Sequence, residues 1–268
     1  MNNFKNISGY DYPNLTEYEK TIRRVPTGVV LNDELSQFSS VNGLSLVIGT
    51  SNIEINSAGL AEHAFNYNIA GNKISVVSTS AQDSFAGTGI QIVLLNGLDN
   101  NFDAIVEVVV LNGTTPVLTV QNFRRLNTTL ILSQGSSNFA VGIISFTDSV
   151  TTGNIHAKIL VGETNPWIGK ICVPRNYTIF FDSVVVSTGN GDEILAKVVL
   201  NSPTIPHQDF ALLFSYAGTV FSPNKAWTRA PEKTDLIFVA KSISGTAKKC
   251  AVTCVVFLIS NDVIASLT

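Results

Sequence analysis

The chain is a succession of short runs rich in β-branched residues, each bounded by glycine, asparagine, aspartate or serine. Such runs are typical of β-strands separated by turns, and no eleven-residue window keeps the 3.6-residue period of an amphipathic helix. In the first half the runs cover residues 44–49, 72–80, 89–97, 103–113, 116–123, 128–135 and 140–147. In the second half they cover residues 169–174, 177–187, 193–200, 210–218, 219–223, 234–244 and 248–260. We therefore predict an all-β, antiparallel fold.

The best candidate for a domain boundary is the stretch TTGNIHAKILVGETNPWIG at residues 151–169, which is rich in turn-forming residues. A chain of 268 residues has room for two domains of roughly 100–150 residues each. We predict two tandem β-sandwich domains of jelly-roll-like type, over residues 36–155 and 156–268. Residues 1–35 lack a clean hydrophobic period and are predicted to form an extended N-terminal arm with a short helix near residues 14–24.

Several turns are readable from their residue types. The loop GLDNNFD at residues 97–103 predicts a hairpin, because aspartate and asparagine tolerate positive φ and bond to their own backbone. NGTTP at residues 112–116 predicts a second turn, so that three consecutive strands form a meander. TGNGD and SGTAK, at residues 188–192 and 244–248, favour tight hairpins in the second domain. The overall strand topology stays open at this point.

Composition excludes two classes of partner. Charged residues make up 14% of the chain, against roughly 25% in an average soluble protein, and the formal net charge is −3. Lysine and arginine do not cluster beyond pairs, so no nucleic-acid partner is expected. The longest apolar run, residues 250–260, is about half of the ~20 residues that cross a bilayer, and no membrane association is expected. The polar amino terminus lacks the pattern of a secretory signal.

One short motif has the spacing of a calcium loop. Asp99, Asn101 and Asp103 match the first three oxygen ligands of that loop. The loop also requires glycine at its sixth place and glutamate at its twelfth, where this chain has Ala104 and Val110. We therefore interpret the motif as a hairpin loop with hydrogen-bonded Asx turns and predict no metal site.

Residues with catalytic chemistry are few and scattered. The chain has three histidines, which we expect in loops or at rims, and three cysteines, which we expect to be buried free thiols: His63, His156, His207, Cys172, Cys250 and Cys254. No nucleophile motif and no phosphate-binding loop is present. We predict no catalytic residue, no cofactor and no enzymatic activity.

Two tryptophans are the candidate contact residues. Trp167 in TNPWIG and Trp227 in NKAWTRAP are both flanked by loop-forming residues. Indole is favoured where one side is apolar and the other wet, so each could stack on a sugar ring or contact another subunit. The alternative is that each tryptophan closes the end of a sandwich.

A longer pattern carries a resemblance. Residues 74–146 contain Ser-Thr-Ser, Asp83 and Ala-Gly-Thr-Gly, followed by Gly-Leu-Asp, Leu-Asn-Gly-Thr-Thr-Pro-Val and a Ser-x-Gly-Ser turn. This stretch resembles a segment of virion-associated proteins of tailed phages, especially those of marine bacteria and cyanobacteria, with relatives in large algal viruses. The second half adds GETNPWIGKICVP and APEKTDL, similar to the continuation of that family. The likeness covers roughly residues 70–260.

The resemblance implies a structural protein of a virus particle: capsid-decorating, minor capsid or tail-associated. We expect it to be made in the host cytoplasm, to reside in the virion and to contact other virion proteins. We also expect a homo-oligomer, with a trimer as the first candidate. The alternative function is a receptor- or carbohydrate-binding fibre module that recognises a host-surface glycan.

Overall fold

The computed structural model describes residues 36–48, 53–54, 70–151, 153–188, 193–202, 208–216, 219–223, 229–243 and 248–267. Every strand pairing in this part of the chain is antiparallel, and the helix α2 (Asn261–Leu267) follows the last strand. The predicted all-β fold is confirmed. The predicted arm and its short helix lie outside the described residues. None of the helices within the described ranges has the length and hydropathy required to traverse a bilayer.

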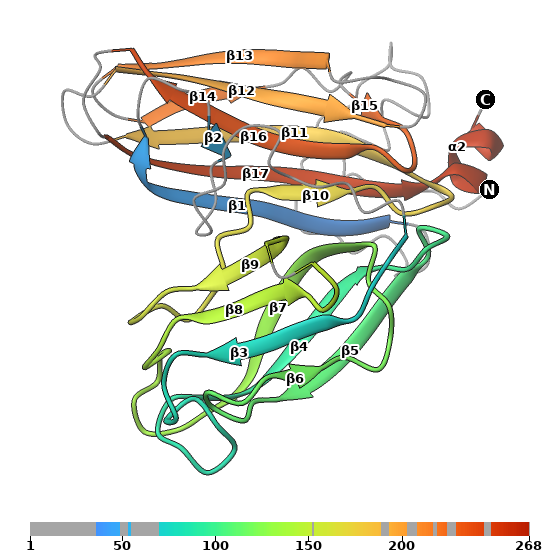
Figure 1. Cartoon of the computed structure of the whole chain (residues 1–268). Helices are drawn as coiled ribbons and strands as arrows, with labels where there is room; N and C mark the ends of the chain where they lie inside the picture. The colour runs from blue at the N-terminus through green and yellow to red at the C-terminus, as the bar shows by residue number, and fades with distance from the viewer. Residues whose placement is uncertain are drawn as a thin grey trace, which may run out of the picture.

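The C-terminal body is a sandwich of two sheets (Figure 1). One sheet has the order β1-β17-β11-β14, with β15 also paired to β11. Its strands are β1 (Ser36–Ile48), β17 (Lys248–Ser260), β11 (Tyr177–Thr188), β14 (Thr219–Pro223) and β15 (Arg229–Ala230). The other has the order β10-β16-β12-β13, with β2 also paired to β16. Its strands are β10 (Lys170–Cys172), β16 (Asp235–Ser242), β12 (Glu193–Asn201), β13 (Gln208–Tyr216) and β2 (Ile53–Glu54).

Strands β2 and β10 are two pieces of one interrupted strand. Both lie along the same edge of β16, where Glu54 is opposite Val239 and Lys170 is opposite Ile237. Between them the carbonyl of Gly169 accepts a hydrogen bond of 3.0 Å from the amide of Phe238. With β2 and β10 taken together as the second strand and β15 left aside, the sheets have the order 1-8-3-6 and 2-7-4-5. This order is that of an eight-stranded jelly roll.

The other body is a second sandwich inserted into that interrupted strand. Its four-stranded sheet has the order β6-β3-β8-β9, built from β6 (Val117–Leu118), β3 (Ile74–Ser78), β8 (Ile144–Asp148) and β9 (Ile155–Ile159). Its three-stranded sheet has the order β5-β4-β7, built from β5 (Ala104–Val110), β4 (Ile90–Leu98) and β7 (Arg125–Gln134). In Figure 1 this inserted sandwich lies below the jelly roll, next to β10 and β1.

The insertion differs from the tandem arrangement predicted over residues 36–155 and 156–268. Strand β1 was assigned to the first domain, yet it pairs along its length with β17, from Ser36 opposite Ile259 to Ile48 opposite Lys248. Strand β9 was not predicted as a strand, and the boundary at residue 155 falls within it. The physical reason is that the first jelly-roll strand finds its partner more than 200 residues away, which no local pattern reveals.

The turns were predicted with mixed success. The hairpin at residues 97–103 is confirmed, since β4 pairs with β5 from Leu98 opposite Ala104 onward. The left-handed residue of its loop is Phe102, at φ 66°, rather than an asparagine or aspartate. The predicted meander is wrong, because β6 pairs with β3 in the opposite sheet. The two tight hairpins of the second domain are also wrong, because β11 and β12, like β16 and β17, belong to different sheets.

Each body has its own apolar core. In the jelly roll, alternate residues of the two sheets face each other, and Phe181, Phe238 and Leu258 are among the buried side chains. In the inserted sandwich the corresponding core contains Ile74, Leu95 and Phe146. Cys250 and Cys254 belong to the jelly-roll core, and with Cys172 they are buried and form no disulfide, as predicted. Burial raises the pKa of the Cys250 thiol to about 12.

A buried carboxylate organises the far end of the inserted sandwich. Asp83 is fully buried and accepts hydrogen bonds from the Ser78 hydroxyl at 2.6 Å and from three backbone amides, those of Ile90, Val141 and Gly142. A Cβ atom at Gly89 would lie 2.1 Å from the Asp83 carboxylate. The Ser-Thr-Ser, Asp and Ala-Gly-Thr-Gly pattern of the sequence is therefore a structural loop built around Asp83.

Candidate functional site: the junction of the two sandwiches

The two bodies are joined by a buried ion pair. Arg125, the first residue of β7, donates from Nε to Asp235 Oδ1 at 2.8 Å and from a terminal guanidinium nitrogen to Oδ2 at 3.0 Å. Asp235 begins β16 of the jelly roll, and both side chains are less than a tenth exposed. A bidentate pair of this kind fixes both distance and orientation. The inserted sandwich is thus held at a defined angle to the jelly roll.

Further contacts surround this pair. The Asn127 side chain donates to the Cys172 carbonyl and accepts from the Cys172 amide, both at 2.9 Å. Cys172 also packs with Leu98 and Phe102 in a small apolar cluster. Because this cluster is buried and lies beside Asp235, the pKa of the Cys172 thiol is raised well above its usual value. The thiol therefore stays protonated at physiological pH and packs as a small apolar group.

An exposed ion pair continues the junction to the surface. The Arg175 guanidinium lies 2.8 Å from a carboxylate oxygen of Asp103, and the Arg175 amide donates to the Phe102 carbonyl at 2.8 Å. The Arg124 guanidinium lies over the Phe102 ring, 4.2 Å from its centroid. These contacts hold Phe102 in its left-handed conformation, which a bulky residue adopts only when its surroundings impose it.

His156 lies in this region and corrects a sequence-based expectation. It was expected in a loop or at a rim, but it is a buried residue of β9. Burial, together with the nearby cations Lys170 and Arg125, lowers its pKa to about 3, against the opposing effect of Asp148. The imidazole is therefore neutral at physiological pH.

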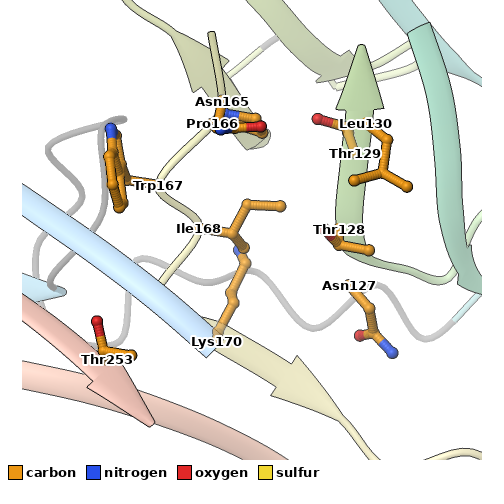
Figure 2. Close-up of a pocket in the computed structure, with 10 residues that line it drawn as sticks. All are labelled: Asn127, Thr128, Thr129, Leu130, Asn165, Pro166, Trp167, Ile168, Lys170 and Thr253. Carbon is orange, nitrogen blue, oxygen red and sulfur yellow. The ribbon is translucent and has the colours of Figure 1, made fainter. Parts of the chain in front are cut away.

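A cavity of about 390 Å³ opens beside this junction. Figure 2 shows Trp167 on one side and residues 128–130 of β7 on the other, with Thr253 of β17 below them. The remaining lining residues are Asn127, Asn165, Pro166, Ile168 and Lys170. The volume is within the range of roughly 300–1,000 Å³ that small-ligand sites have. The cavity is thus large enough for a monosaccharide or a single side chain from a partner.

The wall formed by Trp167 is fixed by a hydrogen bond. The indole N–H donates to Glu163 Oε2 at 3.3 Å, and the ring remains half-buried. On the opposite wall Thr129 is buried, and its hydroxyl has no hydrogen-bond partner within the part of the chain that the structure describes. Lys170 lines the same cavity and is 5% exposed. The cavity therefore combines one aromatic face with polar groups at its walls.

The aspartates of the calcium-like motif bind groups of the protein itself. Asp99 Oδ1 accepts from the amides of Asn101 and Asp103, at 2.8 and 2.9 Å, which are the Asx turns that the sequence indicated. The Asp103 carboxylate is held by Arg175. Across the described ranges, no group of three or more potential metal ligands occurs.

Of the two predicted contact residues, the structure places one in the site. Trp167 lines the junction cavity, whereas Trp227 lies outside the described residues, as do His63 and His207. Arg125, Lys170 and Asp235 were not predicted as residues of the site. Each of the three is the first residue of a strand, where a charged side chain is as readily exposed as buried, so their burial had no clear local signal.

Comparisons with known proteins leave the family open. No protein-family description matches the chain, and no curated protein matches it. A solved structure of the infectious bursal disease virus Gt strain aligns over 84% of this chain and 73% of its own, at 9% identity and a TM-score of 0.21. The VP2 subviral particle of the same virus aligns over 87% and 83%, at 7% identity and a TM-score of 0.13. Scores this low carry no structural argument.

Proposed function

We propose that this chain is a structural component of a virus particle, in which the jelly roll packs beside other virion proteins and the inserted sandwich is displayed as a second module. The observation that supports this proposal is the strand order, an eight-stranded jelly roll with a complete sandwich inserted into its second strand. Jelly rolls recur in viral capsids and in lectins, because their closed double sheet leaves loops and faces free for contacts. The resemblance of residues 74–146 to virion-associated proteins agrees with the first of these uses.

The junction supports a structural role in a second way. The ion pair between Arg125 and Asp235 and the paired hydrogen bonds between Asn127 and Cys172 fix one body on the other. A fixed angle between modules is what a repeating assembly requires, since each copy must present the same surfaces to its neighbours. A structure of the particle would assign this component to the capsid or to the tail.

The experiment is mass spectrometry of purified particles of the virus that carries this gene. Peptides of this chain should be recovered with the particles through a density gradient, in a constant ratio to the major capsid protein. The control is an abundant non-structural protein of the same infection, which should be removed by the gradient. Absence of the chain from purified particles would overturn the proposal.

A second candidate function is carbohydrate binding at the junction cavity. The observation that favours it is Trp167, whose half-buried ring forms a wall of the cavity while Glu163 holds its N–H. Sugars are commonly bound by stacking on such a face, with hydroxyl and amide groups completing the site. A glycan array probed with the full-length protein should give binding that Trp167→Ala abolishes. Phe85→Ala, at an aromatic residue that is 68% exposed in the loop around Asp83, is the matched control. Equal binding by both variants would eliminate this candidate.

A further inference from the structure

The outer face of the three-stranded sheet in the inserted sandwich is aliphatic and open. Val106, Val108 and Val110 of β5 are 51, 52 and 46% exposed, although they are apolar residues on one side of one strand. On β7, Leu130 and Leu132 are 51 and 52% exposed. We call these five residues the aliphatic face. Large apolar side chains gathered on one surface in this way mark interaction sites.

Cross-strand register makes the aliphatic face continuous. Leu94 of the central strand β4 lies opposite Val108 on one side and Leu130 on the other. Ile92 lies opposite Val110 in the next row. The inward residues of the same strands, such as Leu95 and Val109, belong to the core of the sandwich. The strands are therefore apolar on both faces, and only one of those faces is covered by the opposite sheet.

The aliphatic face carries no charge. The polar residues that share the outward positions of β4, β5 and β7 in this region are neutral: Asn96, Thr128 and Gln134. The one ionisable residue of β5, Glu107, has its carboxylate bound to the amides of Val120 and Gln121, at 2.7 and 2.9 Å. A neutral face meets no like-charge repulsion when it is brought against a copy of itself.

The outer edge of β5 is partly covered, which leaves the face as the larger open surface beside this strand. Gln121 donates from its side chain to the Val106 carbonyl at 2.8 Å, and Glu107 holds the neighbouring segment against β5. These bonds cover the middle of the edge that another strand would need. At its other end the same sheet is already packed against the jelly roll, where Leu98 is 1% exposed. Beside β5, the surface that stays open is therefore the aliphatic face.

The area of this surface matches the centre of an interface between subunits. About half of each of the five aliphatic side chains is exposed, which amounts to roughly 400 Å² of apolar surface. This area is comparable to the largest apolar patch on a typical monomer. A standard interface buries about 800 Å² per partner, with an apolar centre and a polar rim. The aliphatic face supplies about half of that area, and the neutral polar residues around it supply a rim.

We infer that the aliphatic face binds the same face of a second copy of this chain, so that two three-stranded sheets stack about a two-fold axis. Sheets packed face to face lie ~10 Å apart, with their side chains interdigitated. A single self-complementary face generates a closed pair, whereas a trimer needs two different surfaces on each copy. The inference concerns the contact between copies and holds whether or not the virion role is correct.

The test uses the full-length protein and two substitutions on the aliphatic face, Val108→Lys and Leu132→Lys. Light scattering coupled to size exclusion should give the wild type twice the 28.7 kDa mass of one chain. Each variant should have a dimer dissociation constant raised at least tenfold, about 1.4 kcal/mol, because it introduces a charge into an apolar contact. These positions are chosen because they do not line the junction cavity, as Leu130 does.

The matched control is Val150→Lys, at a valine that is 75% exposed and lies outside the aliphatic face. This control should dimerise like the wild type. The melting temperatures of all three variants should lie within a few degrees of that of the wild type, since the substituted side chains are at least half exposed. A wild type that stays a single chain at high concentration would overturn the inference. So would a trimer, or a dimer that Val108→Lys and Leu132→Lys leave intact.

Discussion

Arg125 and Asp235 are 110 residues apart in the sequence, yet they form a bidentate ion pair at the boundary between the two sandwiches. Each charge is removed from water by the fold, and each is compensated by the other. Because the two residues belong to different bodies, the pair is the buried ionic contact among those that set the orientation of the inserted sandwich. Loss of this pair should lower the free energy of unfolding and allow the two bodies to move relative to each other.

We predict that replacing one partner of this pair lowers the free energy of unfolding strongly, and that replacing both lowers it less. Arg125→Met and Asp235→Leu should each lower the free energy of unfolding by about 3–5 kcal/mol, because each leaves an uncompensated buried charge. The double variant should regain most of this loss. Urea denaturation measures all four proteins, and Arg175→Met, in the exposed pair with Asp103, should cost less than about 1 kcal/mol. Additive losses in the double variant would contradict the account.

A second prediction concerns Asp83. Its carboxylate accepts four hydrogen bonds, so Asp83→Ala should lower the free energy of unfolding by about 3 kcal/mol or more. Asp83→Asn keeps one acceptor oxygen and should lose less. Chemical denaturation compares the two, with Asp99→Ala in the exposed hairpin loop as the control. A loss below about 1 kcal/mol for Asp83→Ala would show that the loop does not depend on this group.

The buried histidine predicts acid sensitivity. The pKa of His156 is about 3 in the folded protein and 6.5 in the unfolded chain, so the unfolded state binds the additional proton as the pH falls. The stabilisation is complete above pH 6.5 and declines by about 1.4 kcal/mol per pH unit below it. Thermal melts between pH 7 and about pH 5 should show a steeper decline in the wild type than in His156→Gln. Parallel curves would indicate that His156 is not buried in neutral form.

The topology predicts that the inserted sandwich folds by itself. Residues 70–168 are contiguous, and the core that includes Ile74, Leu95 and Phe146 is made from them alone. Expressed with Arg125→Met, so that no buried arginine is left without Asp235, this segment should give a cooperative thermal transition and dispersed amide resonances. A spectrum typical of an unfolded chain would show that the insert needs the jelly roll to fold.

Local structure was largely readable from the sequence. The runs at residues 219–223 and 248–260 are strands with those bounds, and the loop at residues 97–103 is a hairpin. In each case the information is local, because side-chain alternation and turn chemistry act over a few residues. The burial of Cys172, Cys250 and Cys254 followed from the same apolar context.

The arrangement of strands could not be predicted in the same way. That β1 pairs with β17, and that β2 and β10 continue one another across the whole inserted sandwich, depends on contacts between residues far apart in the sequence. The candidate site shares this difficulty: Trp167 was identified by its type, but its place beside Thr129 and Lys170 arises only when both bodies meet. The burial of Arg125 and Asp235 likewise depends on their contact with each other, which the sequence around either residue does not indicate.

The most direct test of the proposed role is a cryo-electron microscopy map of the particles. The account predicts repeated density into which the jelly roll and the inserted sandwich fit as one body, with the angle between them set by the contact of Arg125 with Asp235. It also predicts that jelly rolls lie against neighbouring virion proteins. A map of intact particles in which every protein density is assigned and none fits this chain would contradict it.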